Sequence, residues 1–188
     1  MYPRRTATRI AIASTLVTAM TYLLTGCGDS EPAAVASPVP SDIEVRATDF
    51  HFHDLPEHVI VGTTVTLVND APTEMHELVA LRLADDETRT AEEIMALPQE
   101  ELISLFESSP PAMVILAGPG QEPVVAVGDG TFTEPGRYLI VCAIPTGVSA
   151  ETYFAAVAES DGEGPPQVDG GPPHFVHGMF TELEVVAS

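Results

Sequence analysis

The chain has 188 residues and a formal net charge of −21, because 28 acidic residues face only seven basic ones. A surface this acidic repels phosphate backbones, which excludes nucleic acid as an expected partner. The length fits one domain with a sizeable core, and nothing in the sequence indicates a second.

The N-terminus has the pattern of an export signal. Arg4, Arg5 and Arg9 precede the largely apolar residues 10–24, a run too short for a comfortable membrane span. It closes on Leu-Thr-Gly-Cys at 24–27, which resembles a bacterial lipobox. We therefore predict a lipoprotein signal peptide over 1–26 and lipidation of Cys27. The alternative is an uncleaved anchor in which this cysteine is incidental.

A lipid on Cys27 would hold the mature protein at the outer face of the bacterial cytoplasmic membrane. The pair Arg4-Arg5 is also compatible with twin-arginine export, so the export route stays open. Residues 27–41 are small, proline-rich and without periodicity, which is typical of a flexible tether. Residues 42–188 are expected to form the single domain.

Within this domain, alternating or short apolar runs bounded by turn residues predict β-strands. The predicted strands cover residues 43–47, 59–61, 63–68, 78–83, 112–116, 124–127, 137–142 and 179–186. Short strands joined by turns favour an all-β antiparallel sandwich.

Two insertions interrupt the strands. Residues 90–108 open with a capping-box pattern at Thr90 to Glu93 and predict two short helical stretches. Residues 145–173 contain a helical segment over 150–158, with Ser149 as its cap, and then a Gly/Pro-rich stretch. How the two insertions fold is not determined by these patterns.

Cys142 is the only cysteine of the predicted mature chain besides Cys27. Because exported proteins meet an oxidising compartment, an unpaired cysteine there is expected to be buried or bound to something soft. His174 and Met179 follow it before the last strand, and His76 opens an earlier strand. Thiolate, imidazole and thioether together form a donor set that suits copper.

At these residues the sequence resembles the cupredoxins, the type 1 blue copper proteins. The order is a histidine opening a strand (His76), Pro-Gly-x-Tyr-x-x-x-Cys at 135–142, and His-x3-Gly-Met at 174–179. The resemblance implies a cupredoxin-like Greek-key β-sandwich with short helical insertions. It also implies one type 1 copper ion held by His76, His174 and Cys142, with Met179 as the axial ligand. The sequence departs from the family in the long segment 143–173, which enlarges the ligand loop.

The function implied is single-electron transfer by a monomer that meets an unidentified redox partner protein. An enzyme is not expected, because the sequence offers neither a nucleophile–base pair nor a second metal cluster. Two alternatives remain open: a copper chaperone or storage lipoprotein, and a metal-free cupredoxin-like interaction domain. The residues taken singly are also compatible with ordinary core packing.

Four further histidines have no assigned role. His51 and His53 alternate with phenylalanines, which places both imidazoles on one side of a strand. A second metal at His51, His53 and His58 is one interpretation, and a solvated polar face is the other and favoured one. His177 lies inside His-x3-Gly-Met, where a rim residue is expected rather than a ligand.

Overall fold

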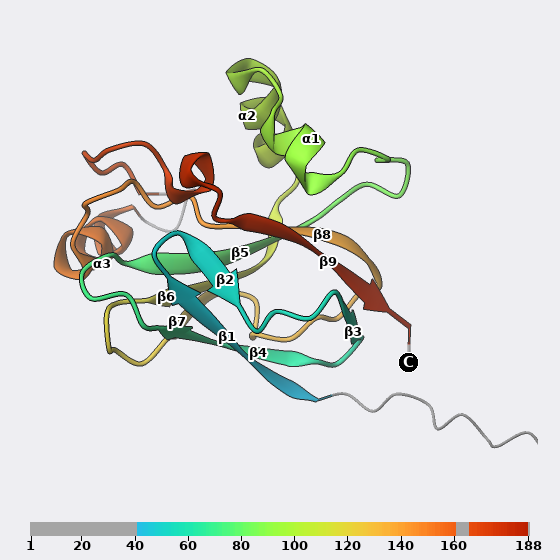
Figure 1. Cartoon of the computed structure of the whole chain (residues 1–188), viewed down its shortest axis with the longest axis horizontal. Coiled ribbons are helices and arrows are strands. Elements are labelled where there is room, and N and C mark those ends of the chain that lie inside the picture. The colour runs from blue at the N-terminus through green and yellow to red at the C-terminus, as the bar shows by residue number, and fades with distance from the viewer. Residues whose placement is uncertain (1–40, 161–165, 188) are drawn as a thin grey trace, which may run out of the picture. The chain divides into compact units, whose positions relative to one another are not determined.

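The computed structural model describes residues 41–160 and 166–187 (Figure 1). The predicted signal peptide, Cys27 and the tether up to residue 40 lie outside the described residues, so these assignments stay predictions. None of the helices described is both long and apolar enough to cross a membrane.

The described residues form a β-sandwich of two sheets (Figure 1). The smaller sheet has the order β2-β1-β4, and the larger has the order β3-β9-β8-β5-β6-β7. The strands of the smaller sheet are β1 (Asp42–Thr48), β2 (His51–His53) and β4 (Thr64–Asn69). Those of the larger sheet are β3 (His58–Ile60), β5 (His76–Arg82), β6 (Pro111–Ala117), β7 (Val124–Val127), β8 (Gly136–Val141) and β9 (Phe180–Val186).

The predicted sandwich with short helices is confirmed, but its sheets are mixed rather than wholly antiparallel. β1 pairs with β4 in parallel, and β3 pairs with β9 in parallel, while the other pairings are antiparallel. The physical reason is a crossover: after β2 the chain passes to the larger sheet as β3 and returns as β4. Alternation of apolar residues gives the face of a strand and not its direction.

The core lies between the sheets, and β8 shows how the sequence builds it. Tyr138, Ile140 and Cys142 belong to the main buried cluster, whereas Leu139 and Val141 belong to a second cluster. Successive strand residues point to opposite faces, so both faces of β8 are covered. This explains why the strand has a continuous apolar run instead of an alternating one.

The second cluster forms where the first insertion packs on the larger sheet. The helices are α1 (Ala91–Met95), α2 (Gln99–Ser108), α3 (Ala150–Glu159) and the 3-10 helix η1 (His174–His177). Ile94 of α1 and Leu102 of α2 join Leu139 and Val141 in the second cluster. The predicted capping box is confirmed, since the Glu93 amide donates to Thr90 Oγ1 and the Thr90 amide donates to Glu93 Oε2.

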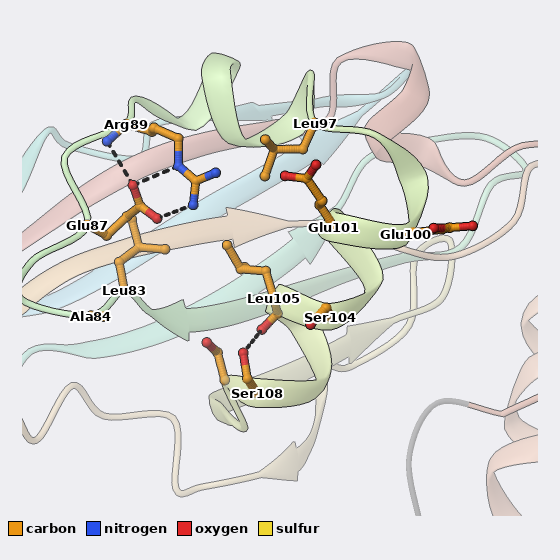
Figure 2. Close-up of a pocket in the computed structure, with 11 residues that line it drawn as sticks. Leu83, Ala84, Glu87, Arg89, Leu97, Glu100, Glu101, Ser104, Leu105 and Ser108 are labelled. Carbon is orange, nitrogen blue, oxygen red and sulfur yellow. Dashed lines mark hydrogen bonds and ion pairs between the residues drawn. The ribbon is translucent and has the colours of Figure 1, made fainter.

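A groove runs between α2 and the loop that follows β5 (Figure 2). Its only cation, Arg89, is already bound by the carboxylate of Glu87 at 2.9 Å from Nε, and Glu100 and Glu101 add further negative charge. None of the predicted metal ligands lines it. We therefore assign the groove to the packing of the first insertion on the sheet and not to the metal site.

Candidate metal centre

The predicted ligands meet because of strand direction. His76 is the first residue of β5, Cys142 directly follows β8, and Met179 directly precedes β9. β8 is antiparallel to both β5 and β9, so the end of β8 lies beside the starts of its two neighbours. Three segments far apart in the sequence thus present ligand-type side chains at one edge of the larger sheet.

Three donor atoms converge at this edge. Nδ1 of His174 lies 3.2 Å from Nδ1 of His76 and 3.3 Å from Sγ of Cys142. All three residues are buried, and their donor atoms lie within 4.8 Å of one another. Ligand atoms that are each about 2.0–2.3 Å from one ion have separations of this size. In the part of the chain that the structure describes, this is the only cluster of three or more His, Cys, Asp and Glu residues close enough to share an ion.

The two imidazoles are held in the state that a metal requires. Burial, and to a smaller extent the neighbouring His174, lowers the pKa of His76 to about 4. Burial also lowers the pKa of His174, although the carboxylate of Glu74 opposes this effect. Both rings are therefore neutral near pH 7 and keep a lone pair for coordination.

The buried sulfur of Cys142 also fits a metal. Burial raises the pKa of the Cys142 thiol well above its usual range, so a thiolate is unfavourable there without a positive charge. A bound cation supplies that charge and stabilises the deprotonated sulfur. The backbone amide of Glu77 points at Cys142 Sγ from 3.4 Å, as a donor to such a sulfur would.

Backbone hydrogen bonds fix Met179 against the segments that carry Cys142 and His174. Its carbonyl accepts from the Cys142 amide at 3.1 Å, and its amide donates to the His174 carbonyl at 3.2 Å. Gly178 between them has a φ of 96°, a left-handed conformation that glycine adopts without strain. Gly178 and Met179 of the motif thus end η1 and lead the chain into β9. Met179 is fully buried.

The long ligand loop returns to a compact geometry. The His174 amide donates to the Ile144 carbonyl at 3.0 Å, and the Phe175 amide donates to the Cys142 carbonyl at 2.9 Å. Further out, Thr146 and Pro172 are joined by the Thr146 amide at 3.1 Å and its hydroxyl at 2.6 Å. The ends of the insertion are therefore tied together, and His174 lies next to Cys142 despite the intervening residues. A longer loop costs little extra closure entropy once its ends are joined.

Glu77 is buried beside the ligands and was not among the residues that the sequence indicated. Its Oε1 accepts from the Ala143 amide at 3.0 Å, and its Oε2 accepts from the hydroxyl of Tyr153 on α3 at 3.2 Å. Burial raises the pKa of this carboxyl to about 7. The only sequence signal was an acidic residue within an apolar strand, directly after His76. Glu77 links β5, the Cys142 loop and the second insertion.

Two more residues that the sequence did not indicate cover His174. The ring of Phe50 meets the His174 ring edge-on, with 4.8 Å between centroids, and it also lies 4.8 Å from the His177 ring. Glu74 Oε2 lies 3.3 Å from His174 Nε2, without the geometry of a hydrogen bond. His174 is consequently 0% exposed. Its outer edge is shielded by an aromatic ring and a carboxylate.

The remaining histidines lie apart from the cluster. His177 is on the rim against Phe50, as expected. His51 and His53 lie side by side on β2 with 4.8 Å between ring centroids. His58 is on β3 of the other sheet, where its Nδ1 lies 3.1 Å from Glu184. Among the described residues, His51, His53 and His58 do not form a cluster close enough to share one ion, so the interpretation of one site made by all three is wrong.

Comparison with known proteins gives neither a matching family model nor a matching curated protein. Among solved structures, the chain is similar to a reduced auracyanin from the photosynthetic bacterium Roseiflexus castenholzii, with 20% identity, a TM-score of 0.42, and coverage of 79% of this chain and 98% of that one. It is also similar to auracyanin B, with 19% identity, a TM-score of 0.37, and coverage of 79% and 91%. A third is auracyanin A of Chloroflexus aurantiacus, described as a "blue" copper protein, with 16% identity, a TM-score of 0.39, and coverage of 79% and 100%.

The chain's own geometry carries the assignment of the site. It has a sandwich of two sheets, with His76, Cys142, His174 and Met179 gathered at one end. Two neutral imidazoles, a buried thiol and a buried thioether are consistent with one type 1 copper ion.

Proposed function

We propose that this protein carries single electrons by means of one type 1 copper ion, at the outer face of the bacterial cytoplasmic membrane. The observation that supports this most strongly is the convergence of three buried donor atoms, with Nδ1 to Nδ1 at 3.2 Å and Sγ to Nδ1 at 3.3 Å. Copper would supply the exchange between two oxidation states that differ by one electron.

The protein's own residues would keep the ligand geometry fixed during that exchange. The Asn69 amide group donates to the Glu74 carbonyl at 2.9 Å and to the Ala117 carbonyl at 2.8 Å, which ties the turn before His76 to the neighbouring strand. Backbone bonds hold Cys142 and Met179 together. A rigid, water-excluding site of this kind reorganises little, which favours electron transfer over metal release.

The burial of the ligands favours an electron carrier over a chaperone, because a chaperone has to release its copper to a competing ligand. His76, Cys142 and His174 are each 0% exposed, so a competing ligand cannot reach the donor atoms without movement of the cover. We expect reversible one-electron voltammetry of the copper-loaded protein and slow copper loss to an excess of chelator. Rapid handover of copper without reversible voltammetry would favour the chaperone or storage role. A protein that takes up no copper would favour the metal-free interaction domain.

Location at the membrane rests on the lipobox and is tested separately. Replacement Cys27→Ser removes the only side chain that the motif predicts to be lipidated. We expect the wild-type protein in the membrane fraction of a bacterial host and the variant outside it. If both proteins partition alike, the anchor is wrong, whereas the copper assignment is unaffected.

A further inference from the structure

The edge strand β2 carries a pair of histidines that the copper centre does not use. His51 and His53 are two positions apart, so their side chains lie on the same face of the strand. Both are exposed, and their ring centroids are 4.8 Å apart. β2 lies at the edge of its sheet, beside β1. Two imidazoles at this spacing can bind one ion between them.

A neighbouring side chain orients one of the two rings. Nε2 of His53 lies 2.6 Å from Oγ1 of Thr48. In the tautomer whose Nε2 donates to that hydroxyl, Nδ1 carries the lone pair. Metal-binding histidines in proteins usually donate their second ring N–H to such an oxygen, which fixes the tautomer. Thr48 therefore stands where a supporting residue of a metal site would stand.

The local charge does not oppose a cation. Arg46 is paired across the strands with His53, but its guanidinium is already bound by Glu44 at 2.7 Å and by Asp70 at 2.5 Å. Two carboxylates thus outweigh the one guanidinium. The chain as a whole carries a net charge of −21, which raises the local concentration of cations.

We propose that His51 and His53 form a surface site for one Cu(II) ion, distinct from the buried centre, with water completing the coordination. Imidazole nitrogen with water suits the tetragonal geometry of Cu(II), and Cu(II) binds such donors more tightly than the other divalent first-row metals. The hairpin that carries the pair also carries Phe50, which covers His174. The site requires no thiolate and does not depend on the proposed electron transfer.

The test is a titration of the purified protein with Cu(II), followed by equilibrium dialysis and electron paramagnetic resonance. We expect a second equivalent with nitrogen hyperfine structure that lacks the intense visible colour of a copper thiolate. His51→Gln and His53→Gln should each weaken this equivalent by about tenfold or more, because a two-ligand chelate becomes a single contact. His58→Gln is the matched control, since His58 is an exposed histidine on another strand and pairs with Glu184.

The outcomes separate the two sites. Loss of the second equivalent in both β2 variants, with the visible band and its intensity unchanged, supports the proposal and shows that the variants fold. A second equivalent that survives both substitutions, or responds equally to His58→Gln, overturns it, as does the absence of any second equivalent. A missing visible band together with a His51-dependent equivalent would sink the type 1 assignment alone.

Discussion

Phe50 is held in a conformation that its residue type disfavours. Its φ is 65° and that of the preceding Asp49 is 29°, so the two residues of the β1–β2 turn both have positive φ. Such turns usually take Asn and Gly, and a bulky residue there is strained. Strained residues persist where the surrounding structure holds them, often at functional sites. Here the strain positions an aromatic ring over His174.

Removal of that ring should open the copper centre. In Phe50→Ala we expect copper loss to an excess of chelator to be about tenfold faster, the size of effect seen when support around metal ligands is lost. Phe50→Tyr is the control, because it keeps the ring over His174. Stopped-flow measurement of the visible band against chelator checks the rates. Equal rates in wild type and Phe50→Ala would show that the ring does not limit access.

The bond between Tyr153 and Glu77 should contribute measurably to stability. Tyr153→Phe removes the hydroxyl that donates to the buried Oε2 of Glu77, leaving a buried carboxyl oxygen with one partner fewer. We expect the free energy of unfolding to fall by about 1–3 kcal/mol in urea denaturation.

Tyr138→Phe is a matched control for that loss, because the Tyr138 hydroxyl donates to the carbonyl of the exposed residue Glu134, which water can satisfy instead. We expect a smaller loss for this variant. A cost for Tyr153→Phe no larger than that for Tyr138→Phe would contradict a structural role for the buried pair.

For single residues, the sequence indicated which side chains could bind a metal but not which side chains lie beside them. His76, Cys142, His174 and Met179 could be selected because each is an unusual donor in a recognisable order. Glu77, Glu74 and Phe50 could not, because their roles depend on which segments fold against them. An acidic residue next to a strand start has no distinguishing pattern until its partner, such as Tyr153, is placed in space.

Among the elements, closure of the long ligand loop depends on close backbone approach. A Cβ on Gly170 would lie 2.6 Å from Cβ of Pro145 and 2.8 Å from Cγ2 of Val148. We therefore expect Gly170→Ala to lower the free energy of unfolding by about 1–3 kcal/mol, since neither contact can give way easily. Gly171→Ala is the milder control, because its nearest contact is Cβ of Thr146 at 3.2 Å. Thermal unfolding of both variants checks this order, and the reverse order would contradict the observed packing of the loop ends.

The strands and helices were predicted far better than the pairings and contacts between them. The expected strands and both helical insertions are present, with the caps at Thr90 and Ser149 in place. Apolar period and cap residues are local signals, so they can be read without the fold. The parallel pairings and the joining of Thr146 to Pro172 are long-range events with no local signal.

At the scale of the whole molecule, arginines pair with some of the many carboxylates, and these ion pairs make the free energy of unfolding depend on pH. Arg137 binds Glu182 at 2.7 Å and 2.8 Å, which lowers the pKa of that carboxyl. The hydrogen bonds from Arg89 likewise lower the pKa of Glu87 to about 2. Both carboxyls therefore have a folded-state pKa below the unfolded value near 4.3. Their stabilising effect is complete above about pH 5 and declines as the pH falls, in the case of Glu87 toward about pH 2.

Glu182→Gln should reveal this dependence. The variant keeps the shape of the side chain but loses the charge that Arg137 binds. We expect its free energy of unfolding to be lower than that of wild type near pH 6, and we expect the difference to shrink as the pH falls below about 4. Urea denaturation across this range checks the trend. A difference that stays constant with pH would mean that the ion pair does not cause the loss.

The central claim is that one copper ion binds between His76, Cys142, His174 and Met179. Its most direct test is the visible absorption of the purified protein titrated with Cu(II), compared with Cys142→Ser. We predict an intense thiolate-to-copper band that saturates at one equivalent and is absent from the variant. A protein that stays colourless, or a band that survives Cys142→Ser, would contradict the claim.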